Sequence, residues 1–225
     1  MSRDVSADLA SRFAEIGRRF DTRGWVLGTS GNFSAVVSRE PLRLAITASS
    51  VHKGQLRAVD ILECDEHGAV VGLGRASSGD GGSVRRASAE TLLHIEIARR
   101  RGAGAVLHTH SVWTTILSDL YAPQGGVSIE GYEMLKGLAG VSSHEQREWV
   151  PIVENDQEMP RLAQRVGALL EEQPGAHAFL LRRHGLYTWG ETLADAERHI
   201  EILEFLFEAV GRTGQFAIYN SQFTK

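Results

Sequence analysis

The stretch Ala105-Val-Leu-His-Thr-His-Ser111 joins a short apolar run to two histidines that lie two residues apart. A run of this length predicts a buried β-strand, and alternate side chains of a strand point to the same face. We therefore expect the imidazoles of His108 and His110 to lie side by side. Paired imidazoles are a common start of a divalent-metal site, and zinc is the usual ion for nitrogen ligands.

A third ligand is expected from His184, which stands in a turn between two strand-like runs, Leu180-Leu-Arg-Arg-His-Gly-Leu-Tyr-Thr-Trp-Gly190. Three histidine ligands would leave one coordination position open, as a catalytic zinc requires. Either His108 or His110 alone would be better explained as a hydrogen-bonded residue of the sheet. The metal hypothesis therefore depends on the three histidines together.

The composition argues against a nucleic-acid or membrane protein. The chain has 225 residues, of which 42% are hydrophobic, and predicts a single domain over residues 1–225. A formal net charge of -4 gives no reason to expect nucleic acid or an anionic membrane as a partner. The single cysteine, Cys64, excludes an intramolecular disulfide, and no apolar run approaches membrane-spanning length. We therefore expect a cytoplasmic protein.

Helical and strand-like periodicities alternate along the chain. This alternation predicts an α/β fold with a central, mostly antiparallel sheet flanked by helices. A segment rich in Gly and Ser, residues 74–85, is expected to be a mobile loop. Helices are expected at residues 4–23, 88–101 (capped by Ser88), 128–138, 157–172 and 192–211, and strands at 28–37 (a turn entering a strand), 42–47, 61–71 (a hairpin), 105–111, 150–153 and 178–189 (two strands and a turn).

Small polar turns form a second group of candidate site residues. The segments Ser30-Gly-Asn32 and Ser49-Ser50, and the predicted helix start at Ser88, offer backbone N–H groups and short hydroxyls that can surround a phosphate. Lys53 would add a positive charge. Glycine and serine are also ordinary turn residues, so no single turn is specific. Their occurrence together with three candidate metal ligands favours a phosphate site.

Several blocks of this sequence resemble the class II aldolase/adducin superfamily across nearly the whole chain. They are Ser30-Gly-Asn-Phe-Ser34, Ser88-Ala-Glu-Thr-Leu-Leu-His94, His108-Thr-His110 and Arg183-His-Gly185. More narrowly, three further blocks resemble a dehydratase family of that superfamily that acts on 5-methylthioribulose 1-phosphate in methionine salvage. These blocks are Glu130-Gly-Tyr-Glu-Met-Leu-Lys-Gly-Leu138, Val150-Pro-Ile-Val-Glu-Asn-Asp-Gln157 and Arg182-Arg-His-Gly-Leu-Tyr-Thr-Trp-Gly190.

The resemblance implies a class II aldolase-like α/β/α sandwich and, usually, a homotetramer with active sites at subunit contacts. It also implies one zinc ion per subunit, held by His108, His110 and His184, and an acid/base carboxylate at Glu133. The implied phosphate positions are Gly31, Asn32, Ser49, Ser50 and Ser88. The role of Lys53 is left open by the resemblance, and we include it with the phosphate positions because of its charge.

Glu133 and Glu90 compete for the catalytic role. In sugar-phosphate aldolases of the superfamily the base resembles Glu90, whereas the sequence around Glu133 resembles the dehydratases, so we place Glu133 first. Each carboxylate also has a simpler explanation. Glu133 would pair with Lys136 three residues along a helix, and Glu90 would be a first-turn charge favoured by the helix dipole.

The expected reaction is the loss of water from 5-methylthioribulose 1-phosphate. Zinc would act as a Lewis acid on the ketone and make the adjacent C–H acidic, a carboxylate would remove that proton, and an acid would protonate the departing hydroxyl. The same metal and phosphate groups would serve a metal-dependent aldolase or epimerase acting on another ketose phosphate. A metal-free interaction domain of the adducin type is a third possibility, but it predicts loss of the three histidines that this chain has.

Overall fold

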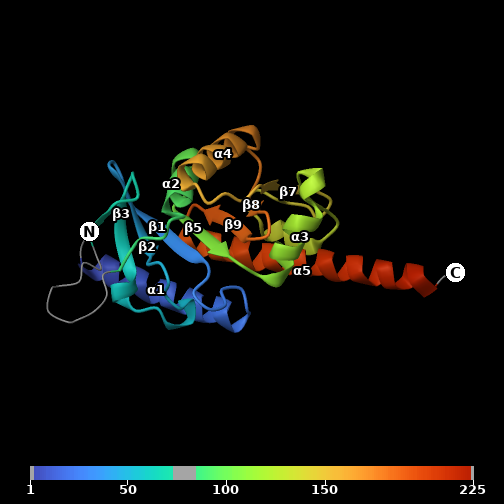
Figure 1. Cartoon of the computed structure of the whole chain (residues 1–225), viewed down its shortest axis with the longest axis horizontal. Helices are drawn as coiled ribbons and strands as arrows, with labels where there is room; N and C mark the ends of the chain where they lie inside the picture. Colours follow the sequence, from blue (N-terminus) through green and yellow to red (C-terminus); the bar gives the residue numbers. More distant parts are fainter. Residues whose placement is uncertain (1–2, 73–84, 224–225) are drawn as a thin grey trace.

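The computed structural model describes residues 3–72 and 85–223 (Figure 1). The expected mobile loop at residues 74–85 therefore lies outside the described residues except for Arg85.

The described residues build a nine-stranded sheet in the order β4-β3-β2-β1-β5-β9-β8-β7-β6. All neighbouring strands pair antiparallel except β7 and β8, which pair parallel. The expected α/β fold with a mostly antiparallel sheet is therefore confirmed. The strands are β1 (Asn32–Arg39), β2 (Leu42–Thr47), β3 (Ile61–Asp65), β4 (Val70–Gly72), β5 (Ala105–Thr109), β6 (Gly126–Ile129), β7 (Glu148–Val153), β8 (Ala178–Leu181) and β9 (Gly185–Gly190).

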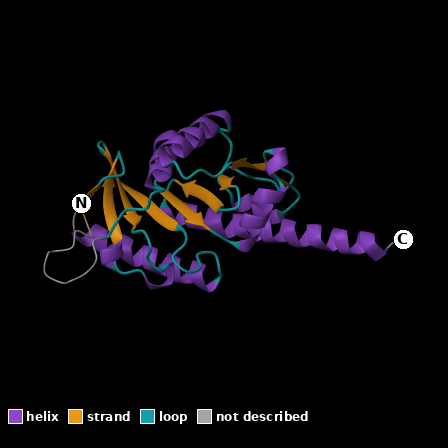
Figure 2. Cartoon of the chain, viewed as in Figure 1, coloured by secondary structure: helices purple, strands orange, loops and turns teal. Residues whose placement is uncertain are grey.

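Helices cover both faces of this sheet (Figure 2). On one face, buried side chains of α1 and α5, among them Phe13, Phe20 and Phe207, share a core with the sheet, and α3 packs against α5. On the other face, α2 and α4 enclose a second core around Leu93 and Val166. The helices are α1 (Arg3–Thr22), α2 (Thr91–Arg101), α3 (Val112–Leu120), α4 (Met159–Glu172) and α5 (Leu193–Phe223).

Three predicted helices differ from the observed ones. The helix expected from Ser88 begins at Thr91, because the Thr91 N–H donates to the Ser88 carbonyl in a turn that precedes α2. The segment 128–138 is not one helix, since Ser128 lies in β6, which pairs with β7, and only the short 3₁₀ helix η4 (Glu133–Gly137) is helical. Helix α5 does not end at Gly211 but continues to Phe223. Gly211 lies within the helix, where it packs against the Trp113 ring of α3.

None of the described helices combines the length and the apolar composition required to cross a bilayer.

Gly17 sets how closely α1 approaches the 3₁₀ turn η1 (Lys53–Gln55). A Cβ atom added at Gly17 would overlap the carbonyl group of Lys53. Because a backbone group cannot move aside as a flexible side chain can, only glycine permits this contact. The contact holds the segment that carries Lys53, one of the predicted anion-binding residues, against the core.

We predict that Gly17→Ala destabilises the protein although alanine is the better helix former. The overlap with Lys53 should lower the free energy of unfolding by about 1–3 kcal/mol, and each kcal/mol corresponds to roughly 2–4 °C in the melting temperature of a chain of this size. Thermal unfolding followed by circular dichroism measures the change. Gly214→Ala is the matched control, because a Cβ atom there meets no atom within 4 Å. A rise in melting temperature for both variants would contradict the close contact.

Candidate metal and anion site

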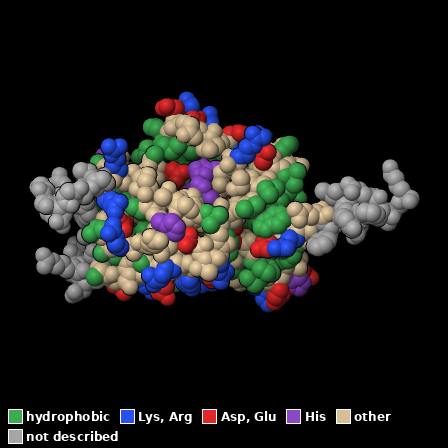
Figure 3. Space-filling model, turned by 60° about the horizontal axis from the view of Figure 1, so that its bottom comes forward, with side chains coloured by type: hydrophobic (Ala, Val, Ile, Leu, Met, Phe, Trp, Pro, Cys, Tyr) green, Lys and Arg blue, Asp and Glu red, His purple; other side chains and the backbone are tan. Residues whose placement is uncertain are grey.

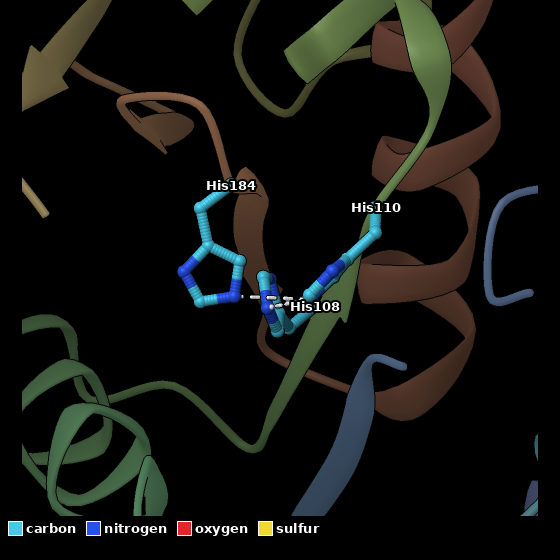
Figure 4. Close-up of side chains that lie close together, drawn as sticks. All are labelled: His108, His110 and His184. Atoms are coloured by element: carbon cyan, nitrogen blue, oxygen red, sulfur yellow. Dashed lines mark hydrogen bonds between the residues drawn. The ribbon is translucent and has the colours of Figure 1, made fainter. Parts of the chain in front are cut away.

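His108, His110 and His184 bring three imidazole nitrogens together at one end of β5 (Figure 4). The His110 Nε2 atom lies 2.7 Å from His108 Nε2 and 3.1 Å from His184 Nε2. His108 is the fourth residue of β5, His110 follows the strand directly, and His184 stands in the turn between β8 and β9. The geometry therefore brings together the three histidines that the sequence nominates.

Neighbouring groups fix the orientation of the His108 ring. Its Nδ1 lies 2.9 Å from the Leu186 carbonyl, which can only accept, so Nδ1 carries the proton and Nε2 keeps its lone pair. The Tyr187 ring stacks on this imidazole with 3.8 Å between centroids, and Phe179 stacks on the other face of Tyr187 at 5.0 Å. The ring is thus held by packing and by one hydrogen bond.

The turn that carries His184 is held by α3. The Ser118 Oγ accepts a hydrogen bond from the Arg183 N–H at 2.9 Å, and Thr115 Oγ1 donates to the His184 carbonyl at 3.2 Å. Arg183 has a φ of 55°, an unusual conformation for a residue other than glycine. The tight turn aims the His184 imidazole at the other two rings.

Burial keeps the three imidazoles neutral. It lowers the pKa of His110 to about 3 and lowers the pKa of His108 well below its ordinary value, with further lowering by the other two histidines. Burial also lowers the pKa of His184, although the nearby Glu90 opposes that effect. A neutral imidazole has a free lone pair, which is the form that binds a metal ion.

These residues fit a divalent metal ion. In a tetrahedral site with zinc–nitrogen bonds of about 2.0–2.1 Å, the nitrogens lie about 3.3 Å apart, close to the 2.7 and 3.1 Å separations here. The buried His184 Nδ1 has no hydrogen-bond partner among the described residues, so its ring relies on packing and on what its Nε2 binds. Three nitrogen donors that converge from one side leave the other side free for a substrate.

Glu90 is the carboxylate nearest this cluster. Its Oε1 lies 3.2 Å from His184 Nε2 and its Oε2 lies 3.7 Å from His108 Nε2. Glu90 is the residue that precedes α2, and its Oε2 accepts a 2.5 Å hydrogen bond from Asn32 Nδ2. A group bound by the three histidines would therefore contact the Glu90 carboxylate.

A cavity of about 120 Å³ opens beside the histidines and Glu90. Figure 3 shows histidine side chains beside acidic ones near the middle of one face of the molecule. Every residue predicted to bind phosphate lines this cavity, and the lining as a whole comes from four separate segments of the chain. The lining residues are Thr29, Ser30, Gly31, Asn32, Ala48, Ser49, Ser50, Lys53, Ser88, Glu90 and His110.

The backbone of the cavity is tightly constrained. Gly31 has a φ of 70°, and a Cβ atom there would come within 2.6 Å of the His108 carbonyl, so only glycine suits this position. Ser50 has a φ of 59°, which is costly for a residue with a side chain. Strained backbone of this kind is often found where a ligand binds.

Lys53 places its amine inside the cavity wall. Its side chain is 1% exposed, and Nζ donates to the carbonyls of Thr29 and Val51 at 3.1 and 2.9 Å. Burial lowers the pKa of the amine to about 8, while Glu90 opposes the shift. The amine therefore remains mostly protonated at pH 7, and its third N–H is free of these two bonds.

Glu133, which we ranked first as the acid/base group, lies elsewhere in the chain. Among the described residues its ionic partners are Lys136, at 2.7 Å, and His144, at 3.5 Å, and its side chain is 72% exposed. The ion pair with Lys136 lowers the pKa of Glu133. Within one chain, Glu90 and not Glu133 contacts the histidines.

Two buried residues near the site escaped the sequence analysis. They are Tyr187 and His94. Tyr187 is fully buried beside Glu90 and stacked on His108, and burial together with Glu90 raises its pKa well above 10. His94 lies one helical turn after Glu90, a spacing that places both on one face of α2 and could have signalled a shared role.

Glu204 supports strand β5 on the face opposite the His108 side chain. Thr109, between the two histidines, donates through Oγ1 to Glu204 Oε1 at 2.5 Å. Glu204 lies on α5, is 2% exposed and has its pKa raised to about 7 by burial. This carboxyl group ties α5 to the strand that positions His108 and His110.

Comparison with known proteins places the chain among related sequences. The family model described as the Class II Aldolase and Adducin N-terminal domain matches residues 11–210. A protein of Methylococcus capsulatus named methylthioribulose-1-phosphate dehydratase is 48% identical over 200 residues, which cover 88% of this chain and 91% of that protein. A protein of the same name from Marinobacter nauticus is 44% identical over 203 residues, covering 90% of this chain and 92% of that protein.

Solved structures with the same fold include two L-fuculose 1-phosphate aldolases. One has a TM-score of 0.72 at 22% identity and covers 96% of this chain and 89% of its own. The second, from Thermus thermophilus, has a TM-score of 0.71 at 23% identity and covers 94% of this chain and 98% of its own. These similarities show that the chain has the class II aldolase fold.

We predict that Glu204→Gln stabilises the protein increasingly as the pH rises from 5 to 8. Below pH 4.5 the Glu204 carboxyl is protonated in both folded and unfolded chains. Between pH 4.5 and about 7 only the unfolded chain releases the proton, so wild-type stability falls with rising pH, and above 7 the loss is complete. The full effect is roughly 3 kcal/mol.

Denaturant unfolding of both proteins at pH 5 and pH 8 tests this pH dependence. The exposed carboxyl Glu172 provides the control, since Glu172→Gln should shift stability equally at both pH values. An advantage of Glu204→Gln that does not change with pH would show that Glu204 is ionised in the folded state.

Proposed function

Since the chain belongs to the class II aldolase and adducin family, we propose that it is a zinc-dependent lyase of methionine salvage. In this proposal it removes water from 5-methylthioribulose 1-phosphate and forms 2,3-diketo-5-methylthiopentyl 1-phosphate in the cytoplasm. The observation that carries the proposal is a cluster of three histidine nitrogens that adjoins a carboxylate and a cavity lined by every candidate phosphate contact. The dehydratases of Methylococcus and Marinobacter support the choice of substrate.

The metal site is assigned to His108, His110 and His184. Three neutral nitrogen donors with one open side suit zinc. When bound, the ion would supply Lewis-acid stabilisation of the negative charge that develops on the substrate's ketone oxygen.

The phosphate group is assigned to the cavity beside the histidines. Gly31 contributes backbone and Asn32, Ser49, Ser50 and Ser88 contribute short polar side chains. The buried Lys53 ammonium uses two of its three N–H groups on carbonyls, and the third would meet the phosphate. Anchoring the phosphate at C1 would place C2 and C3 of the substrate next to Glu90 and the histidines.

Glu90 is assigned as the base that removes the C3 proton. It contacts the histidines, and its Oε2 is held by Asn32. Loss of the C3 proton and of the C4 hydroxyl releases one water molecule and leaves an enol that becomes the diketone. The hydroxyl needs a proton as it leaves, so a second acid is required.

Glu133 is assigned as that acid, acting in the site of a neighbouring subunit. Within its own chain, Glu133 does not contact the three histidines, because its side chain is exposed and paired with Lys136. Donating a proton requires that this ion pair be broken when Glu133 enters the neighbouring site, since the pair lowers its pKa. The proposal therefore links the second proton transfer to assembly.

We infer that the assembly is a homotetramer. Helix α3 exposes an apolar stripe of Val112, Ile116 and Leu120 that begins two residues after His110, and these side chains are 62%, 47% and 63% exposed. Figure 3 shows hydrophobic side chains gathered on this side of the molecule. A contiguous apolar stripe of this kind is typical of a protein interface. Light scattering that gave the mass of one chain would contradict the assembly.

An aldolase or epimerase acting on another ketose phosphate is the second candidate. The presence of Glu90 rather than Glu133 beside the histidines favours it, because the base of sugar-phosphate aldolases in this superfamily resembles Glu90. Aldol cleavage would yield two smaller fragments, and epimerisation would yield an isomer of unchanged mass. Mass analysis of the products separates both from a diketone that has lost one water.

We predict that the zinc-loaded protein converts 5-methylthioribulose 1-phosphate to the diketone with one zinc bound per chain. Product is followed by the absorbance of its conjugated enol form, and metal content by atomic emission. His184→Ala should reduce both bound zinc and turnover at least 100-fold, because two histidines cannot complete the site. Full turnover by metal-depleted protein would contradict the metal assignment.

We predict that Glu90→Gln and Glu133→Gln block different proton transfers. Each should lower kcat by about 10²–10⁴-fold, the usual contribution of an acid or base. In D₂O, Glu133→Gln should still exchange the C3 hydrogen of the substrate, whereas Glu90→Gln should not.

The control for this pair is Lys136→Gln, which breaks the ion pair but keeps the Glu133 carboxylate and should retain turnover within about threefold, since surface ion pairs contribute little. Normal turnover by Glu133→Gln would show that Glu133 has no role in the reaction and only pairs with Lys136. C3 exchange by Glu90→Gln would remove Glu90 as the base.

A further inference from the structure

We propose that Ser34 and His94 are positioning residues that fix the side-chain amide of Asn32, so that its nitrogen faces Glu90. This inference rests on the proposed function of Glu90 as the base. It assigns a role to Ser34 and His94, which are both buried. Neither residue belongs to the histidine cluster or lines the cavity.

A continuous chain of hydrogen bonds joins the four residues. The Ser34 Oγ lies 2.7 Å from His94 Nδ1, and His94 Nε2 bonds to Asn32 Oδ1. Asn32 Nδ2 in turn lies 2.5 Å from Glu90 Oε2 and 3.3 Å from Ser88 Oγ. Ser34 and His94 are fully buried and Asn32 is 4% exposed, so water does not compete for these bonds.

Chemistry fixes the direction of every bond in this chain. An ionised Glu90 can only accept, so the amide must present its nitrogen to Glu90 and its oxygen to His94. That oxygen also only accepts, so His94 must carry its proton on Nε2. Burial keeps His94 neutral by lowering its pKa to about 3, so Nδ1 has no proton and accepts one hydrogen bond from the Ser34 hydroxyl.

Secondary structure holds the chain in place. Ser34 and Asn32 are two residues apart on β1 and therefore share one face of the sheet. His94 and Glu90 are one turn apart at the start of α2. The sheet and the helix thus each contribute one buried residue and one residue of the site.

The consequence concerns the amide of Asn32. An asparagine amide is nearly symmetric in shape, so it can rotate by 180° unless its neighbours prevent it. A flipped amide would turn its oxygen toward the Glu90 carboxylate, which repels it, and would leave Glu90 without its donor. Ser34 and His94 exclude that state, so their loss should disturb Glu90 without removing any group from the cavity.

The first test reads the protonation of His94 and does not need a substrate. Magic-angle-spinning NMR of ¹⁵N-histidine-labelled zinc-loaded protein at pH 7 distinguishes the two neutral tautomers and the cation, and comparison with His94→Gln identifies the His94 signals. We expect a neutral ring protonated on Nε2. A neutral ring with its proton on Nδ1 would overturn the proposal, because Nε2 could then only accept and the amide of Asn32 would be reversed. A cationic ring would overturn the role of Ser34, because Nε2 would then donate to Asn32 without help from Ser34.

The second test uses turnover by matched variants. His94→Leu, which removes the donor to Asn32, should lower kcat by about 10–100-fold at unchanged zinc content, as loss of a supporting hydrogen bond typically does. His94→Gln can place an amide N–H near the former Nε2 and should recover at least tenfold of that loss. Ser34→Ala should lower kcat by roughly tenfold, since the tautomer is no longer fixed.

Thr188→Val is the matched control for deleting a buried hydroxyl. Thr188 is fully buried and donates to the His177 carbonyl at 2.7 Å, away from this chain of bonds. It should retain kcat within about twofold even where its melting temperature falls, as expected for one lost hydrogen bond. Equal losses in Thr188→Val and Ser34→Ala, or equal losses in His94→Leu and His94→Gln, would reduce Ser34 and His94 to structural residues.

The two tests separate this inference from the proposed function. If the wild-type protein forms no diketone, the dehydratase assignment fails, while the NMR spectrum still decides the protonation of His94. If the wild-type protein is active and His94 is protonated on Nδ1, the positioning role alone fails.

Discussion

The antiparallel pairing of β1 with β5 is the constraint on which the site depends. Its register sets Asn32 directly opposite His108 and Phe33 opposite Leu107. Phe33 and Leu107 are both fully buried in the core beneath α1 and α5, while Asn32 and His108 point the other way. A slip of one residue would exchange these faces, and Asn32 at the start of β1 would no longer lie opposite His108 on β5. The same apolar pairing that builds the core therefore brings the two halves of the site together.

The low polarity around the histidines follows from that arrangement. Tyr187 and Phe179 form a stacked layer under His108, and α5 closes the opposite face of β5 through Glu204. His108 is fully buried, and His110 and His184 are partly buried, so the rings remain neutral. Charges placed there interact more strongly than at the surface. Burying polar groups is unfavourable unless each finds a partner. The bonds of His94, Asn32 and Thr109 provide such partners, which explains why polar residues cluster behind the site.

Sequence periodicity predicted a helix or strand correctly where its contacts with neighbouring elements favour the same structure. The strand Leu42–Thr47 and the starts and ends of α1 and α4 could be predicted to within a few residues, because apolar spacing and glycine or proline signals coincide there. Residues 128–138 have helical spacing too, yet pairing with β7 makes their first part a strand. Gly211 lies against the Trp113 ring of α3, so this glycine marks a close contact between two helices and not the end of α5. Both outcomes are set by contacts between distant segments.

The candidate site divides in the same way. The pairing of His108 and His110 could be predicted from strand alternation, and the residues lining the cavity could be predicted from their types. Which of Glu90 and Glu133 lies beside the histidines could not be predicted in this way. Glu90 is near the histidines because α2 starts beside β1, a relation between segments that no local pattern contains. On α3, Val112, Ile116 and Leu120 have the spacing of core residues but face outward. Exposed apolar side chains in such a stripe are typical of a protein interface. Under the proposed assembly, the role of Glu133 depends on a neighbouring subunit, a relation that no pattern within one chain encodes.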